Sequence, residues 1–349
     1  MTPYIRPHIV SMAGYVPGEQ PQNVVFTKLN TNENPYPPSP AVKEALVAAV
    51  TDRLRLYPDP VGNTFRRAVA KLHDVEPEMV LAGNGSDDIL TIITRAFVGA
   101  GDLVAYPTPS YLLYSTLTQL QDGREKVVPF SHDWNLEFET FGGPGVKLAF
   151  LANPNSPSGT AFTHEEVGRL AEQLDCPLVV DEAYADFAAP EYRSVSLVRN
   201  HSNVIVTRSF SKGYSLAGIR LGYLIAQPWL VDHLMKVKDS YNCDMLSLVA
   251  GTAAIEDQNY LAETRAKILK TRDRLASALR QRGYSVPDSQ TNFVWATGGR
   301  PARPTFEHLK EHRVLVRYMA YPGYPDGLRI SIGTDAEIDR LLEVLKAEP

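Results

Sequence analysis

The sequence predicts an α/β fold in which a parallel sheet carries helices on both faces, followed by a smaller α+β domain. Short apolar runs alternate with helical stretches from about residue 64 to residue 255, the pattern of a parallel sheet. Polar loops follow several of these runs, where ligands bind beyond the carboxyl ends of parallel strands. The 349 residues suit about two domains. We expect an N-terminal arm over residues 1–29, a large domain over 30–245 and a small domain over 246–349.

The composition is ordinary for a globular protein, with 44% hydrophobic and 21% charged residues. A net charge of -5 without any lysine and arginine block argues against nucleic acid as a partner. The N-terminus lacks signal-peptide features, and no apolar stretch suits a membrane span. Cys176 and Cys243 form no metal-binding or disulfide pattern, so we expect no metal and a cytoplasmic location.

The elements of the large domain follow in order. Residues 1–40 are rich in proline and predict an extended arm that ends in a rigid loop. A helix is expected from Pro40 to Val50, because Ser39 is a good N-cap and proline is favoured at the first helical position. Strands are then expected at 79–81, 104–106, 146–151, 178–180 and 203–207, and helices at 88–97 and 164–174.

The C-terminal part begins with a long helix over about 258–283, which Gly283 is expected to end. Strands follow at 293–295, 314–316 and 328–332, and a final helix at 335–347. This mixture predicts the smaller α+β domain.

The most informative segment is Thr207–Lys212, where hydroxyls at Ser209 and Ser211 accompany a lysine after an apolar run. A single lysine after a strand is usually a solvated surface residue. Here the hydroxyls and a second cation, Arg220, share the neighbourhood, which favours a functional amine. A lysine whose pKa is lowered by burial or by nearby cations can form a Schiff base.

Asp181 ends another apolar run upstream, and Tyr184 follows it. A carboxylate and an arginine suit a cofactor with a pyridinium nitrogen at one end and a phosphate at the other. We therefore predict pyridoxal 5'-phosphate (PLP) attached to Lys212, with Asp181 at the ring nitrogen and Tyr184 at the ring 3'-oxygen. Arg220, Ser209 and Ser211 would hold the phosphate. Taken alone, Asp181 would be a loop cap, Tyr184 a core residue and Arg220 half of an ordinary ion pair.

A second candidate phosphate site is Gly83–Asp88, a glycine-rich turn that leads into a helix. The backbone N–H groups of a helix N-terminus bind anions. Such turns are common, and this one matches no nucleotide-binding pattern, so it is weak evidence by itself.

Three further segments complete the candidate site. Tyr111 follows a strand, where its ring would either stack on the cofactor or pack in the core. An amide in the loop 153–159 is a candidate partner of the 3'-oxygen. Arg329 interrupts an apolar strand, and arginine is rarely buried without a partner, so we interpret it as the anion site of the substrate, with Arg317 as a second cation.

Together these segments resemble the histidinol-phosphate aminotransferase family, within the fold type I PLP-dependent aminotransferases. The resemblance runs nearly end to end and is carried by residues 29–37, 57–59, 83–88, 153–159, 181–184, 209–212, 216–220 and 328–334. It implies a large domain with a mostly parallel seven-stranded sheet between helices, a smaller α+β C-terminal domain and an N-terminal arm.

The resemblance also implies residue roles. Lys212 would be the Schiff-base lysine, Asp181 would lie at the pyridine nitrogen, and Tyr184 at the 3'-oxygen. The resemblance assigns the phosphate to Ser86, Asp87, Ser209, Ser211 and Arg220, ring stacking to Tyr111, and substrate contacts to Tyr15, Asn32, Arg317 and Arg329. A homodimer is implied, in which Tyr57 reaches the cofactor phosphate of the neighbouring subunit. The family's usual asparagine before Pro-Thr-Gly is Ser156 here, so the 3'-oxygen contact would come from Asn155, from Ser156 or from Tyr184 alone.

The implied activity is reversible transamination between L-histidinol phosphate and 2-oxoglutarate, giving imidazole acetol phosphate and L-glutamate in histidine biosynthesis. Arg329 would bind the phosphate of one substrate and the α-carboxylate of the other. Two other activities stay open: transamination of aromatic or other amino acids, and decarboxylation of a phosphorylated amino acid. The intact Lys212, Asp181 and Arg220 argue against a non-catalytic binding protein.

Overall fold

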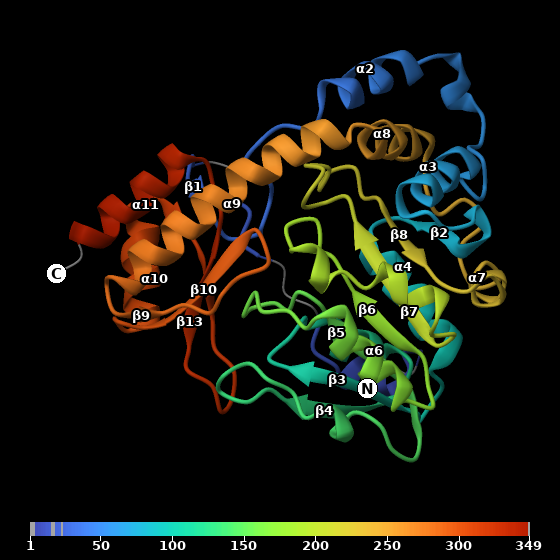
Figure 1. Ribbon diagram of the computed structural model, residues 1–349, viewed down its shortest axis with the longest axis horizontal. Coiled ribbons are helices and arrows are strands. Elements are labelled where there is room, and N and C mark those ends of the chain that lie inside the picture. Colours follow the sequence, from blue (N-terminus) through green and yellow to red (C-terminus); the bar gives the residue numbers. More distant parts are fainter. Residues whose placement is uncertain (1–3, 15–17, 22–23, 348–349) are drawn as a thin grey trace.

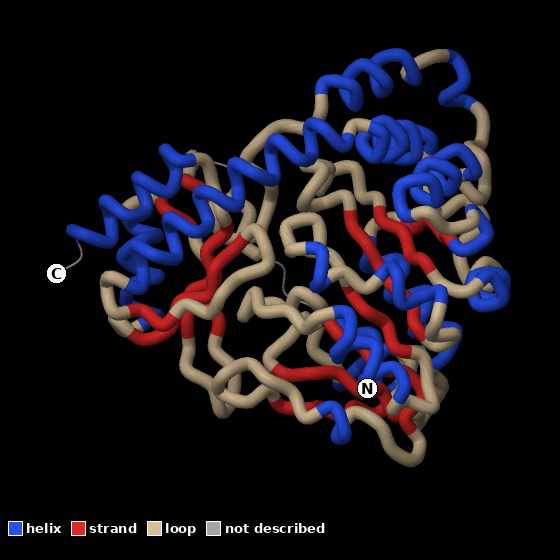
Figure 2. Tube along the Cα trace, viewed as in Figure 1, coloured by secondary structure: helices blue, strands red, loops and turns tan. Residues whose placement is uncertain are grey.

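The computed structural model describes residues 4–14, 18–21 and 24–347. Two sheet-containing units lie side by side, and helix α9 (Gln258–Arg280) runs across the top of the molecule from one to the other (Figure 1). Helices flank the strands of both units (Figure 2). Within the described ranges, no helix has the length and apolar character needed to cross a lipid bilayer.

The larger unit contains a seven-stranded sheet in the order β2-β8-β7-β6-β5-β3-β4. β8 is antiparallel to both of its neighbours, and the other six strands run in one direction. The predicted mostly parallel sheet is therefore confirmed. Its strands are β2 (Val80–Gly83), β3 (Leu103–Thr108), β4 (Arg124–Pro129), β5 (Val146–Ala152), β6 (Leu178–Asp181), β7 (Val204–Ser209) and β8 (Gly222–Ile225).

Both faces of this sheet are covered. In β6, Leu178 and Val180 belong to one buried cluster and Val179 to another, on the opposite face. Because both faces are buried, the central strands read in the sequence as uninterrupted apolar runs. The helices of this unit are α2 (Pro40–Ala49), α3 (Asn63–His73), α4 (Ser86–Phe97), α5 (Leu113–Leu120), α6 (His164–Glu172), α7 (Pro228–Leu234) and α8 (Met245–Glu256).

Local signals set the start of several helices. The Ser39 side chain accepts a hydrogen bond from the N–H of Ala41, and Pro40 opens α2, as the sequence predicted. Helix α6 begins with a capping box between Thr163 and Glu166. Short 3-10 turns lie at Asp52–Arg55, Pro77–Met79, Phe138–Thr140, Pro190–Tyr192 and Val195–Arg199.

The smaller unit has a four-stranded sheet in the order β12-β13-β10-β9. Its elements are β9 (Tyr284–Ser285), β10 (Phe293–Gly298), α10 (Ala302–Glu311), β12 (Arg317–Met319), β13 (Gly327–Ser331) and α11 (Asp335–Ala347). The arm contains a short helix, α1 (Pro7–Ser11), which the sequence did not predict. The arm then adds strand β1 (Thr27–Lys28), which pairs in parallel with β11 (Val314–Leu315).

The position of α8 bears on the domain boundary expected at residue 245. Leu248, Ala250 and Ala254 share one buried cluster with residues of the large sheet, and α8 packs against α2 and α3. We therefore propose that the large domain extends through α8 and that the small domain begins with α9.

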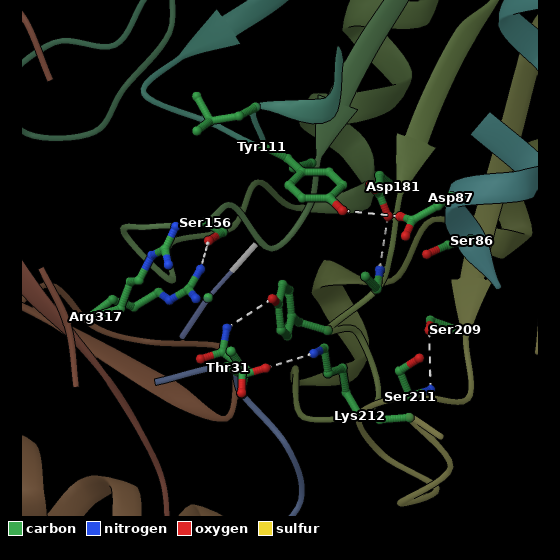
Figure 3. A pocket seen from close by; sticks show the side chains of 18 of the residues that line it. Thr31, Ser86, Asp87, Tyr111, Ser156, Asp181, Ser209, Ser211, Lys212 and Arg317 are labelled. Atoms are coloured by element: carbon green, nitrogen blue, oxygen red, sulfur yellow. Dashed lines mark hydrogen bonds between the residues drawn. The ribbon is translucent and has the colours of Figure 1, made fainter. Parts of the chain in front are cut away.

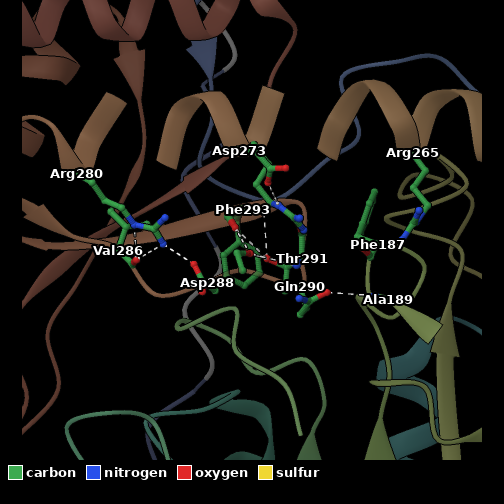
Figure 4. Close-up of polar contacts among 12 residues, drawn as sticks. Phe187, Ala189, Arg265, Asp273, Arg280, Val286, Asp288, Gln290, Thr291 and Phe293 are labelled. Atoms are coloured by element: carbon green, nitrogen blue, oxygen red, sulfur yellow. Dashed lines mark hydrogen bonds and ion pairs between the residues drawn. The ribbon is translucent and has the colours of Figure 1, made fainter. Parts of the chain in front are cut away.

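Polar contacts fix the small domain against the loops at the carboxyl ends of the large sheet (Figure 4). Arg265 of α9 donates hydrogen bonds to the carbonyl oxygens of Asp186, Phe187 and Ala188. The N–H of Gln290 donates to the carbonyl of Gly159 at 2.7 Å, and the Gln290 side chain accepts from the N–H of Ala189 at 3.1 Å. These contacts hold β10 and β13 beside the ends of β5 and β6.

Candidate active site

Most of the residues predicted to bind the cofactor and substrate meet in one cavity of about 290 Å³ between the two domains (Figure 3). It lies at the carboxyl ends of β5, β6 and β7, beside the N-terminus of α4, and β12 and β13 contribute its small-domain wall. The predicted residues that line it are Asn32, Ser86, Asp87, Tyr111, Ser156, Asp181, Tyr184, Ser209, Ser211, Lys212, Arg220, Arg317 and Arg329.

Lys212 lies in the loop after β7, and its Nζ donates a hydrogen bond to the carbonyl of Thr31 at 3.0 Å. Burial, reinforced by the charge of Arg329, lowers the pKa of Lys212 to about 8. A larger share of this amine is therefore unprotonated near neutral pH than in an exposed lysine, which suits a nucleophile or a base. The amide of Asn34 fixes the loop by donating to the carbonyls of Lys212 and Gly213.

Asp181 ends β6 and is only 5% exposed. The Tyr114 hydroxyl donates to its Oδ2 at 2.8 Å, and the N–H of Ala183 donates to its Oδ1 at 3.2 Å. Burial raises the pKa of Asp181 to about 6 despite these bonds. A carboxylate in such surroundings interacts strongly with a neighbouring cation, so Asp181 suits a protonated ring nitrogen.

The part of the cavity beside the N-terminus of α4 is rich in hydrogen-bond donors. Ser86 and Asp87 form the first turn of α4, whose N–H groups lack partners within the helix, and the side chains of Ser209, Ser211 and Arg220 lie beside it. The turn before α4 requires glycine: Gly85 has a φ of +84°, and a Cβ there would lie 2.7 Å from Nη2 of Arg220. Amides, hydroxyls and a guanidinium together fit a phosphate.

Tyr111 and Tyr184 supply aromatic rings to the cavity wall. The Tyr111 hydroxyl donates to Oδ1 of Asp87 at 3.0 Å (Figure 3). The Tyr184 hydroxyl oxygen accepts from Nδ2 of Asn32 at 2.9 Å. With a buried lysine of lowered pKa, a buried carboxylate and a cluster of donors around one cavity, the residues present fit PLP.

The loop 153–159 does not bring Asn155 to the cavity. Its buried amide donates to the carbonyl of Pro109 and to Oγ of Ser158, and its Oδ1 accepts from Ser110. These bonds turn the side chain into the loop, so the cofactor contact predicted for Asn155 has no support in the structure. Ser156 lines the cavity instead.

Two arginines form the small-domain wall. Arg317 of β12 and Arg329 of β13 are directly opposite each other in the antiparallel register, an arrangement in which like charges are destabilising. Among the described residues, Arg329 donates only to neutral oxygens, to Oγ of Ser156 at 3.0 Å and the carbonyl of Asn30 at 3.2 Å, and its buried Nε makes no hydrogen bond. An anion between the arginines would offset their repulsion.

Like Asn155, Tyr57 does not line this cavity. Tyr57 is 81% exposed and stacks on Tyr241 with ring centroids 4.5 Å apart. Tyr15 falls outside the described residues.

Several residues that hold the predicted ones in place were not predicted from the sequence. Tyr114 supports Asp181, and Arg208 forms buried ion pairs with Glu182 and Asp186, each at 3.0 Å. Arg208 precedes Ser209, and Glu182 follows Asp181, so these pairs tie the end of β6 to the end of β7. The sequence contains a signal for these pairs, because Arg208 lies next to Ser209 and Glu182 lies next to Asp181, each at the end of an apolar run.

Comparisons with known proteins agree with this geometry. Residues 24–345 match the model of the family described as aminotransferase class I and II. The chain therefore belongs to the class I and II aminotransferases.

Several curated relatives identify the branch of this class. A histidinol-phosphate aminotransferase of Rhodopirellula baltica is 49% identical over 98% of this chain and 94% of its own length. One of Geotalea daltonii is 44% identical over 98% of each chain. A crystal structure of histidinol-phosphate aminotransferase from Sinorhizobium meliloti, in complex with pyridoxal-5'-phosphate, matches with a TM-score of 0.91 and 28% identity over 99% of each chain. The predicted membership in the histidinol-phosphate aminotransferase family is confirmed.

Proposed function

We propose that this protein transfers an amino group between L-histidinol phosphate and 2-oxoglutarate, with PLP as its cofactor, in histidine biosynthesis. The observation that carries the proposal is the pair Arg317 and Arg329, which faces the same cavity as Lys212. Two adjacent guanidinium groups suit a phosphate monoester in one half-reaction and the carboxylates of 2-oxoglutarate or glutamate in the other.

The chain's own residues account for the proton transfers. Bound PLP supplies an electron sink for the charge that develops when the Cα–H bond of the substrate breaks. With its lowered pKa, Lys212 would take the Cα proton of the bound substrate and hold it as an ammonium. Asp181 would hold a proton at the ring nitrogen, and Tyr184 would donate to the 3'-oxygen. Arg329 orients the substrate anion, so that the Cα–H bond faces Lys212.

A panel of amino donors tests the proposed substrate. We expect L-histidinol phosphate to convert the PLP-loaded protein fastest in a single half-reaction, followed by absorbance. L-histidinol, which lacks the phosphate, is the matched control, and it should react roughly a hundredfold less efficiently because charge-assisted hydrogen bonds to the arginines are lost. Faster conversion by phenylalanine or tyrosine would favour an aromatic aminotransferase. Release of carbon dioxide from a phosphorylated amino acid without a keto acid would favour a decarboxylase.

We further propose a homodimer in which Tyr57 reaches the cofactor phosphate of the neighbouring subunit. Several apolar side chains in the segment that leads to Tyr57 are about half exposed or more, namely Val47, Val50, Leu54 and Leu56, and so is Tyr241, on which Tyr57 stacks. A second cavity, of about 590 Å³, opens between α2, α8 and the Tyr57 loop. An apolar surface of this kind supports association with a second copy.

Two variants separate the roles of this surface. Val50→Glu combined with Leu54→Glu should give monomers in sedimentation velocity, because charges would be buried at the interface. Tyr57→Phe should leave the dimer intact but weaken PLP binding about tenfold, since one hydrogen bond to a charged phosphate is lost. Monomers that bind PLP as tightly as the unaltered protein would exclude the contribution of Tyr57 across the interface.

A cytoplasmic location is also part of the proposal. Cys176 and Cys243 support it, because both are buried free thiols.

A further inference from the structure

Asn32 connects the two domains beside the cavity through four hydrogen bonds. Its backbone N–H donates to Oγ of Ser331 at 2.8 Å, and its carbonyl accepts from Nδ2 of Asn292 at 3.0 Å. In its side chain, Oδ1 accepts from Oγ of Ser331 at 2.8 Å, and Nδ2 donates to the hydroxyl oxygen of Tyr184 at 2.9 Å. The amide therefore lies between the last residue of β13 and the tyrosine assigned to the cofactor ring.

These bonds determine which way the amide faces. Oγ of Ser331 accepts from the backbone N–H of Asn32 and donates its own hydrogen to Oδ1 of Asn32. Nδ2 is then the atom that faces Tyr184, and the tyrosine oxygen receives a donor rather than an acceptor. Asn32 is 1% exposed and has a φ of +58°, a conformation that asparagine tolerates better than most residues with a side chain.

We propose that Asn32 is a positioning residue that orients the Tyr184 hydroxyl and links it, through Ser331, to the strand that carries Arg329. The bond from Nδ2 keeps the Tyr184 O–H from pointing toward Asn32. It also polarises that O–H, which becomes a stronger donor to the 3'-oxygen of PLP. The inference rests on the proposed role of Tyr184, and it gives Asn32 a role besides the substrate contact that the sequence predicted.

The link to Arg329 follows from strand geometry. Arg329 and Ser331 are two residues apart in β13, and alternate residues of a strand project from the same face. The strand that holds the substrate anion therefore also holds the residue that orients Asn32. A displacement of β13 when the anion binds would be transmitted to the Tyr184 hydroxyl.

The test is the pH midpoint of the visible absorbance band of the PLP-loaded protein. A donor to the 3'-oxygen stabilises the form in which that oxygen is fully anionic and the Lys212 nitrogen is deprotonated. The donor therefore lowers the midpoint, and weakening the donor raises it. Asn32→Gly removes the amide but keeps the left-handed backbone, and it should raise the midpoint by about half a unit to one unit, the equivalent of one hydrogen bond. Ser331→Ala should raise it less.

Tyr184→Phe is the reference for this experiment. It should raise the midpoint more than Asn32→Gly does, and adding Asn32→Gly to it should cause no further rise, because both act through one hydroxyl. Thr271→Ala, which removes a buried hydroxyl outside the cavity, should leave the midpoint unchanged.

The outcomes that oppose the inference are separate from those that oppose the proposed function. An unchanged midpoint in PLP-bound Asn32→Gly, or full additivity with Tyr184→Phe, overturns the role of Asn32 alone. An unchanged midpoint in Tyr184→Phe removes the role of Tyr184, and the inference falls with it. If Asn32→Gly does not fold, Asn32→Asp replaces the donor with an acceptor of the same size, and an unchanged midpoint there overturns the inference equally.

Discussion

Lys212→Ala should lower the rate of the half-reaction with L-histidinol phosphate by roughly a thousandfold to ten-thousandfold, the size of contribution that a positioned base makes. Lys212 is the one residue to which both the cofactor linkage and the transfer of the Cα proton are assigned. Its pKa of about 8 makes the amine available near neutral pH. The measurement is single-turnover absorbance of the PLP-loaded variant.

Two variants complete this test. Lys212→Arg keeps the positive charge, but a guanidinium stays protonated and cannot act as a base, so it should lose as much activity as alanine. Lys147→Ala removes an exposed lysine of β5 and should react normally. Full turnover by Lys212→Ala, with a cofactor that borohydride still fixes to the protein, would contradict the assignment.

Arg329→Ala should reduce kcat/KM for both L-histidinol phosphate and 2-oxoglutarate by roughly a hundredfold to a thousandfold. The guanidinium supplies charge-assisted hydrogen bonds to the anion of each substrate, and each such bond contributes about 1.5–3 kcal/mol. Arg329→Lys should recover only part of the loss, because an ammonium cannot form the two parallel bonds of the guanidinium. Steady-state kinetics with each substrate varied in turn gives the measurement.

The thermal midpoint of Arg329→Ala provides the control for folding. Arg317 and Arg329 carry like charges in directly opposite positions, so removing one should relieve repulsion and offset the lost contacts to Ser156 and Asn30. We therefore expect little change in the unfolding temperature. An unchanged KM for both substrates would remove Arg329 from the binding site.

The buried core of the sheet was predictable because its signals are local. The apolar runs that became β5, β6 and β7 are buried on both faces, and Ser39 and Pro40 begin α2 as expected. By contrast, β4 was missed because only Val128 of this edge strand is buried, so it shows no apolar run. β8 was not predicted, because its apolar run is short and directly follows the loop that contains Arg220.

By itself, the sequence determined the fold class, and it singled out Lys212, Asp181 and the glycine-rich turn before α4 as site candidates, because each of these signals depends on a few residues adjacent in the chain. Only the tertiary structure decided which loop side chains face the cavity. In the structure, the Asn155 amide donates to the carbonyl of Pro109 and does not face the cavity. Ser156 contacts Arg329, and Asn32 contacts Ser331, which lies 299 positions away in the sequence. The contacts of Asn155 depend on how two loops of the large domain pack, and the other two depend on how the two domains pack; no local pattern of residues encodes either.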